Sequence, residues 1–119
     1  MAVTKTARTL LTSQSLAAAT SVNATELNLS TAYAGTVVFV KLTNGATAPT
    51  TAPIVTFYSG ESTGTKRKRY AASGDTVNSS VNEPYFITDQ GDMFVNVTIT
   101  NGATNAITVE CYAQEATAI

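Results

Sequence analysis

Two stretches of this chain share one pattern, and that pattern constrains the fold more than any other feature of the sequence. The first, TVVFVKLTNGAT, spans Thr36–Thr47, and the second, FVNVTITNGAT, spans Phe94–Thr104. In each, apolar residues alternate with other types, as in a half-buried strand, and Thr-Asn-Gly-Ala-Thr follows. Because Asn-Gly adopts the positive φ of a tight reversal at little cost, we expect each copy to turn back as a hairpin.

A second strand is expected after each turn, at Pro53–Tyr58 in the first copy and at Ile107–Tyr112 in the second. Within Met93–Thr100 only one alternating set is uniformly apolar, so that set is predicted to face the core, with Phe94 and Asn96 facing outward. The shared pentapeptide transfers this assignment to the first copy. The residues predicted to face inward are Val38, Val40, Leu42, Val55, Phe57, Met93, Val95, Val97, Ile99, Ile107, Val109 and Cys111.

The rest of the chain divides into short strand-like segments separated by turn residues. Further strands are expected within Thr6–Thr12, Val22–Ser30, Lys66–Ala72 and Val81–Thr88. Seven or eight short strands, with turn signals every ~8–12 residues, predict an all-β protein with a single antiparallel β-sandwich. We place this sandwich in residues 22–119. Residues 1–21 are assigned to an N-terminal strand or arm with a linker or short helical turn at 13–21, and the arm is either frayed or paired with a neighbouring subunit.

Composition and charge restrict the partners of this chain. Its 119 residues form one domain of ordinary size, and charged residues make up only 13% of them, against about a quarter in average proteins. Thr, Ser and Asn take their place, which predicts a neutral surface that repels its own copies weakly, so we expect a homo-oligomer. The net charge of -1 attracts neither nucleic acid nor an anionic membrane. Without a secretion signal or an apolar run of ~18–20 residues, synthesis in the cytoplasm is expected.

No group of residues in the sequence demands a reaction. Histidine is absent, which excludes Ser-His-Asp and Cys-His catalysis. The one cysteine, Cys111, is predicted to be an inert core thiol, and it leaves no disulfide within the chain. Asp89 and Asp92 flank Gly91 with a spacing that fits an ordinary turn better than a Ca²⁺ loop. We therefore expect no enzyme, no catalytic residue, no metal and no cofactor.

Four consecutive cations, Lys66, Arg67, Lys68 and Arg69, form the strongest charge feature, and Tyr70 follows them. The run could dock onto an acidic protein surface or onto phosphates, with the tyrosine for stacking. It could equally be an edge strand that charge guards against unwanted pairing. Because alternate residues of a strand point to opposite faces, at most two cations share a side. We favour the guarded edge.

Three motifs resemble a known class of proteins. They are Arg-Thr-Leu-Leu at Arg8–Leu11, Thr-Asn-Gly-Ala-Thr at Thr43–Thr47, and Val-Glu-x-x-Ala-Gln-Glu at Val109–Glu115. Together they resemble small all-β virion proteins of tailed bacteriophages, over about half of the chain. The resemblance implies a structural component of the phage particle, in particular a capsid decoration (cement) protein with a jelly-roll-like fold. It carries over no catalytic residue.

We therefore expect a virion protein, made in the host cytoplasm, that binds the major capsid protein or other virion proteins through many modest contacts multiplied by avidity. It is expected to bind no nucleic acid and no membrane. The candidate contact residues are the N-terminal arm, the outward aromatics Phe39, Tyr58 and Tyr112, and the cations Lys66, Arg67, Lys68 and Arg69. Two alternatives remain, a tail, collar or fibre-associated protein and a glycan-binding β-sandwich module. The absence of tryptophan disfavours the second.

Overall fold

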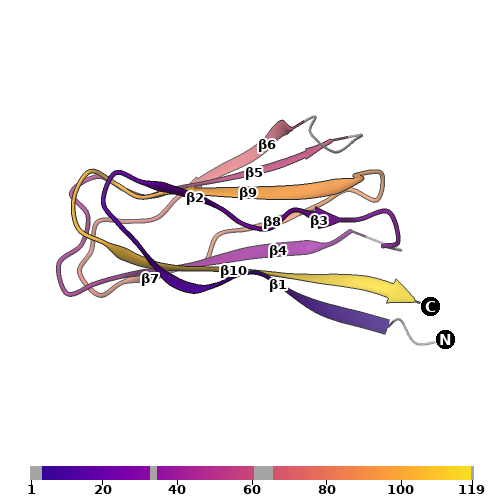
Figure 1. Ribbon diagram of the computed structural model, residues 1–119, viewed down its shortest axis with the longest axis horizontal. Coiled ribbons are helices and arrows are strands. Elements are labelled where there is room, and N and C mark those ends of the chain that lie inside the picture. Colours follow the sequence, from indigo (N-terminus) through magenta and orange to yellow (C-terminus); the bar gives the residue numbers. More distant parts are fainter. Residues whose placement is uncertain (1–3, 33–34, 61–65, 119) are drawn as a thin grey trace.

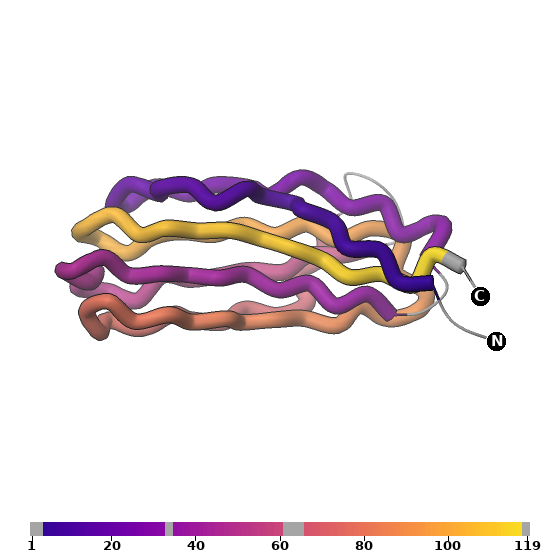
Figure 2. The backbone as a smooth tube through the Cα atoms, turned by 90° about the horizontal axis from the view of Figure 1, so that it is seen from below, coloured from indigo at the N-terminus to yellow at the C-terminus, as the bar shows by residue number. Residues whose placement is uncertain are grey.

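The chain folds into two antiparallel β-sheets that pack face to face (Figure 1). The computed structural model describes residues 4–32, 35–60 and 66–118. None of these residues lies in a helix, so the described part of the chain has no helix that could cross a membrane. The start of β1 and the end of β10 lie together at one end of the molecule (Figures 1 and 2).

In the described part of the chain each sheet has five strands. Sheet A contains β1 (Thr4–Leu16), β10 (Ile107–Ala118), β4 (Val37–Asn44), β7 (Val81–Asn82) and β8 (Tyr85–Ile87). Its order is β1-β10-β4, and β4 then pairs with both β7 and β8. Sheet B contains β2 (Ser21–Asn23), β3 (Leu27–Asn28), β9 (Phe94–Thr100), β5 (Ile54–Gly60) and β6 (Arg67–Ser73). Its order is β2-β9-β5-β6, with β3 also on β9.

This strand order is that of a jelly roll. If β2 with β3 and β7 with β8 are each counted as one interrupted strand, the two sheets have four strand positions each, as in a double-sheet jelly roll. The predicted all-β antiparallel sandwich is therefore confirmed, with ten strand segments among the described residues in place of the seven or eight expected.

The two repeated stretches are not hairpins, and that prediction is wrong. The first copy leaves sheet A at Asn44 and enters sheet B at Ile54, and the second leaves sheet B at Thr100 and enters sheet A at Ile107. Each turn therefore crosses from one sheet to the other. The crossings interlock, because β4 pairs with β10 and β9 pairs with β5.

The two interlocked pairs have the same register. In sheet A, Leu42 lies opposite Val109, and at the equivalent place in sheet B, Ile99 lies opposite Val55. Repeating one pattern twice thus produces two sheets with the same inward-facing positions. The inward-facing apolar residues of the two sheets pack against each other in the space between the sheets, as in other β-sandwiches.

The Asn-Gly pairs do not supply positive φ values, which corrects a second prediction. The non-glycine residues with positive φ in the described chain are Ala19, Ser79 and Asn105, and neither Gly45 nor Gly102 lies in the left-handed region. A chain that crosses between two sheets spans a wider gap than a two-residue hairpin turn, so the tight primed turn is not needed.

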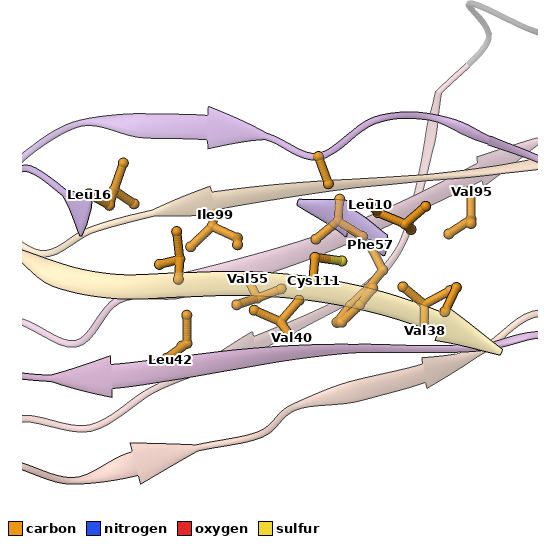
Figure 3. Close-up of a cluster of buried hydrophobic side chains, with 14 of the residues drawn as sticks. Leu10, Leu16, Val38, Val40, Leu42, Val55, Phe57, Val95, Ile99 and Cys111 are labelled. Atoms are coloured by element: carbon orange, nitrogen blue, oxygen red, sulfur yellow. The ribbon is translucent and has the colours of Figure 1, made fainter. Parts of the chain in front are cut away.

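The core lies between the two sheets (Figure 3). Eleven of the twelve residues predicted to face inward are buried there, and Leu10, Leu16, Ala24, Leu29 and Ala113 join them. Met93 is the exception, with 45% of its surface exposed, because it precedes β9 and does not share the alternation of that strand. Phe94 and Asn96 were expected outside but are buried. The amide of Asn96 is covered by Glu26, to whose Oε2 it donates at 2.9 Å.

The N-terminal segment is part of sheet A. β1 extends past the predicted Thr6–Thr12 and pairs with β10 along its whole length. The linker or helical turn expected from residue 13 begins only after Leu16. The single strand expected at Val22–Ser30 is broken into β2 and β3, because in between Ala24 N–H donates to Val97 in sheet B while Thr25 N–H donates to Leu10 in sheet A.

Candidate functional site

The outer face of sheet A carries a continuous group of apolar side chains. In β4, Val37 and Phe39 alternate with the core residues and therefore point away from the core. Their partners in β8 are Ile87 and Tyr85, and Tyr112 of β10 lies on the other side of Phe39. We call these five residues the apolar face.

Two of the aromatics predicted as contact residues meet on this face. The rings of Phe39 and Tyr112 lie 5.7 Å apart with an interplanar angle of 38°. The Tyr112 hydroxyl donates to Glu110 Oε1 at 3.0 Å, and this hydrogen bond raises the pKa of Tyr112 above its ordinary value. Glu110 lies opposite Lys41 in the ladder, so the charges on this face are of both signs.

Tyr85 and Ile87 were not predicted as contact residues from the sequence, and they are the most exposed members of the apolar face. Tyr85 is 60% exposed and Ile87 is 55% exposed. Their alternation with Phe86 was visible in the sequence and predicted a strand there. The sequence did not show that β8 would continue the outer face of β4.

The outer face of sheet B is different, and Tyr58 lies on it. Tyr58 pairs with Asn96 of β9 and Lys68 of β6, far from Phe39 on the opposite sheet. Polar side chains bond to one another across this face, for example Thr98 with Asn23 at 2.7 Å. The three predicted aromatics thus do not form one surface.

The four cations lie at or beside β6, which is an edge strand of sheet B. The register shifts between Phe57–Tyr70 and Tyr58–Lys68, which makes Arg69 the extra residue of a β-bulge. Lys66 and Lys68 are exposed. At least one cation of the run is therefore removed from the regular alternation of the strand.

Arg69 is bound by side chains of its own chain at the surface. Its guanidinium lies 2.6 Å from Asp89 Oδ2 and 2.6 Å from Asp92 Oδ1, and the bond to Asp89 is the main cause that raises its pKa. The guanidinium carbon also lies 5.6 Å from the centre of the Phe86 ring. The two aspartates form the expected turn, since Asp92 N–H donates to Asp89 C=O. They hold an arginine, and the described residues contain no cluster of three metal-binding side chains.

A hollow of about 450 Å³ opens beside β8, between the two sheets. Tyr70 of β6 lines it together with residues 83–87. Tyr70 is 46% exposed, and its ring stacks on the buried ring of Phe57. The hollow therefore has an aromatic wall and lies between the edge strands β8 and β6.

The remaining candidate for chemistry, Cys111, is inactive in this fold. Its side chain is buried in the core, and burial raises the pKa of its thiol to about 12. A thiol that stays protonated is a poor nucleophile and a poor metal ligand.

No family model and no curated protein sequence matches this chain. Solved structures share its fold at low sequence identity. The PBSX exported protein XepA superposes with a TM-score of 0.68 at 10% identity, over 96% of this chain but only 37% of its own. A protein of Bacillus endospore appendages, described as disulfide-linked pili, gives a TM-score of 0.58 at 18% identity and covers 100% of this chain and 93% of its own. The SPBc2 prophage-derived protein YomS gives 0.56 at 17% identity over 96% of both chains.

Proposed function

We propose that this chain is a structural protein of a tailed-phage particle and decorates the outside of the capsid through the apolar face of sheet A. The observation that carries the proposal is the difference between the two outer faces. One presents Phe39, Tyr85, Ile87 and Tyr112 side by side, whereas the other carries the hydrogen-bonded polar pairs Ser21–Thr100 and Asn23–Thr98, with Ile54 and Tyr58 beside them. A protein with one apolar face suits attachment to a large surface with its polar face towards solvent.

The composition of the apolar face fits a binding surface. Aromatic residues supply most of the binding energy at protein interfaces, and Tyr is among the residues enriched at such positions. Lys41 and Glu110 lie beside the aromatic pair, where they would set orientation more than affinity. Many copies on a symmetric shell would multiply a modest contact by avidity.

The shared fold supports the class of protein, though it does not specify the role. YomS is described as prophage-derived and matches this chain over nearly its whole length. The endospore appendage protein shows that the fold also occurs in an extended assembly. Lys66 and Lys68 remain in the proposal as exposed cations, and Arg69 does not, because two aspartates already hold it.

Co-sedimentation with expanded capsids of the encoding phage tests the proposal. The unmodified chain should sediment with the capsids and raise their resistance to heat, because binding to the assembled state alone stabilises that state. Phe39→Asp should weaken binding at least about tenfold, since it places a charge at the centre of the apolar face. Tyr58→Asp is the matched control, because it makes the same change on the other sheet and should leave binding unchanged.

Three results would contradict the proposal. The first is failure of the folded chain to bind capsids, and the second is equal loss of binding by both variants. The third is location in the tail, collar or fibre base in rings of small fixed order, which would favour the alternative virion role. A glycan array tests the remaining alternative, in which Tyr70 and Tyr85 would stack on sugar rings beside the hollow.

A further inference from the structure

The edges of the two sheets are protected to different degrees. An edge strand exposes unpaired N–H and C=O groups, and proteins guard such edges with charge, bulges or short interrupted strands. β6 carries cations and a bulge, and β1 carries Lys5, Arg8 and several register shifts. The third edge is broken between β2 and β3. The fourth edge is likewise interrupted, between β7 and β8, but Tyr85, Phe86 and Ile87 themselves include neither a charge nor a register shift.

The backbone groups of β8 that face the free edge can be identified. Val40 N–H donates to Pro84 C=O, and Thr88 N–H donates to Thr36 C=O. The even-numbered residues from 84 to 88 therefore bond to β4. Because hydrogen-bonding direction alternates along an antiparallel strand, the N–H and C=O groups of Tyr85 and Ile87 point away from β4. These backbone groups therefore face outward from the edge of sheet A that lies opposite β1 (Figure 2).

The space beside this edge is open. No described strand lies beyond β8 in sheet A, the side chains of Tyr85 and Ile87 are more than half exposed, and the hollow of about 450 Å³ opens on the sheet-B side of residues 83–87. A neighbouring strand needs only about 4.7–4.9 Å of lateral room. The edge thus combines unpaired backbone groups, apolar side chains and space for one more strand.

We propose that two copies of this chain pair through β8, antiparallel, about a two-fold axis beside Phe86. Tyr85 then lies opposite Ile87 of the second copy, and Ile87 lies opposite Tyr85 of the second copy. Each pair exchanges both of its N–H···O=C bonds, because these are the residues whose backbone groups face the edge. Sheet A of one copy continues into sheet A of the other.

The edge is complementary to itself, which is why a second copy is the occupant. A two-fold axis requires one surface to match its own copy, and a segment centred on Phe86 with equivalent free groups on both sides meets that condition. Each cross-strand pair joins an aromatic to a β-branched residue, which is a favourable combination. The net charge of -1 opposes association only weakly. The two apolar faces would become continuous across the axis.

The ladder of hydrogen bonds between the two copies should end after the Tyr85–Ile87 pairs. Glu83 would lie opposite Asp89 of the second copy, and two carboxylates repel. The N–H of Asp89 is also occupied, since it donates to Asp92 Oδ2 at 2.8 Å. A contact this short buries less than the ~1,200 Å² of a stable complex, so we expect a dissociation constant on the order of 0.1 mM.

This inference deepens the proposed function, since it names one contact between neighbouring copies on the particle. It is tested on the purified chain alone, so the two can fail separately. A chain that binds capsids without dimerising refutes only the inference, and a dimer that ignores capsids refutes only the proposed function.

Sedimentation equilibrium of the full chain between about 1 μM and 1 mM measures the association. Ile87→Pro removes one edge-facing N–H and should weaken the dimer at least about tenfold, since proline is tolerated at free edges but cannot donate. Ile87→Lys supplies a guarding charge and should act similarly if the proline variant does not fold. Glu83→Gln should tighten the dimer about two- to fivefold, and added salt should act in the same direction.

Amide hydrogen exchange gives the site-specific readout. The N–H groups of Tyr85 and Ile87 should become more protected as protein concentration rises, while that of Met93 stays unchanged. A chain that remains monomeric at 1 mM would overturn the inference. So would a dimer that both Ile87 variants leave intact, or one that only Phe39→Asp disrupts, because that result would indicate face-to-face packing.

Discussion

The two copies of Thr-Asn-Gly-Ala-Thr have the same sequence and different surroundings. In the second copy, the buried amide of Asn101 donates to the carbonyls of Leu16 and Asn105. In the first, the buried amide of Asn44 donates to the loop that begins at Asp75. The asparagine therefore acts in both as an anchor for a neighbouring segment. What differs is the segment, which the pentapeptide itself does not specify.

The first test of this comparison is to shorten the side chains at two equivalent core positions. Phe57 and Cys111 occupy the same place in the two copies, and both are fully buried. Phe57→Ala should lower the free energy of unfolding by about 3–5 kcal/mol, because it removes a ring and leaves a cavity. Cys111→Ala should have a much smaller effect. Urea denaturation measures both, and equal losses would contradict the assigned packing.

The glycines of the two copies should respond differently to a methyl group. A Cβ on Gly102 would lie 1.9 Å from the carbonyl oxygen of Thr51, whereas at Gly45 the nearest atom is 3.8 Å away. Gly102→Ala should therefore destabilise the fold by about 1–3 kcal/mol or more, because a backbone segment must move. Gly45→Ala is the matched control and should be within about 1 kcal/mol of the parent. Thermal unfolding of the two glycine variants measures this difference, and similar melting temperatures would contradict the close contact at Gly102.

Removing the side-chain amides of the two asparagines should destabilise different parts of the molecule. Asn101→Ala and Asn44→Ala each remove the hydrogen bonds that a buried amide donates to a neighbouring segment, so each should lower stability by about 1–3 kcal/mol. Hydrogen exchange should rise at the end of β1 in the first variant and in residues 75–80 in the second. Exchange that spreads equally over both regions in either variant would argue against separate anchors.

Lowering the pH should weaken the contact between Asn44 and the Asp75 loop and leave the contacts of Asn101 unchanged. Hydrogen bonds from Ser80, the largest cause, and from Val77 N–H and Asn44 hold the pKa of Asp75 below its ordinary 3.8. A lowered pKa means that this contribution to stability is complete near neutral pH and is lost as pH falls through the folded-state pKa. The anchors of Asn101 are backbone carbonyls and do not titrate.

Backbone NMR between about pH 6 and about pH 2 measures this difference, which is the smallest of the four. Residues 75–80 should shift before the segment around Asn101 does. Asp75→Asn is the control and should abolish the early transition. Simultaneous shifts in both segments of the parent protein would mean that acid acts on the whole fold and not on this contact.

The partners of the basic run could not be predicted from the sequence. Four adjacent cations suggested either a docking site or a guarded strand edge, but the bulge in β6 turns Arg69 towards Asp89 and Asp92, which lie about twenty residues away in the chain. Likewise, Phe39 and Tyr58 were equivalent in the sequence as outward aromatics, and the sheets place them on opposite sides of the molecule. Neither result was visible in the spacing of the residues.

Alternation in the sequence was enough to predict that the chain is all-β, roughly where its strands lie, and that Val38, Val55, Val97 and Val109 face the core. Alternation records the burial of each strand independently of its neighbours, so it can be read locally. Only the fold showed that the repeats cross between sheets, that Tyr85 and Ile87 extend the apolar face, and that no described strand pairs with the outer side of β8. Strand neighbours are chosen by contacts between residues far apart in sequence, and period two specifies a face of a strand but not its partner.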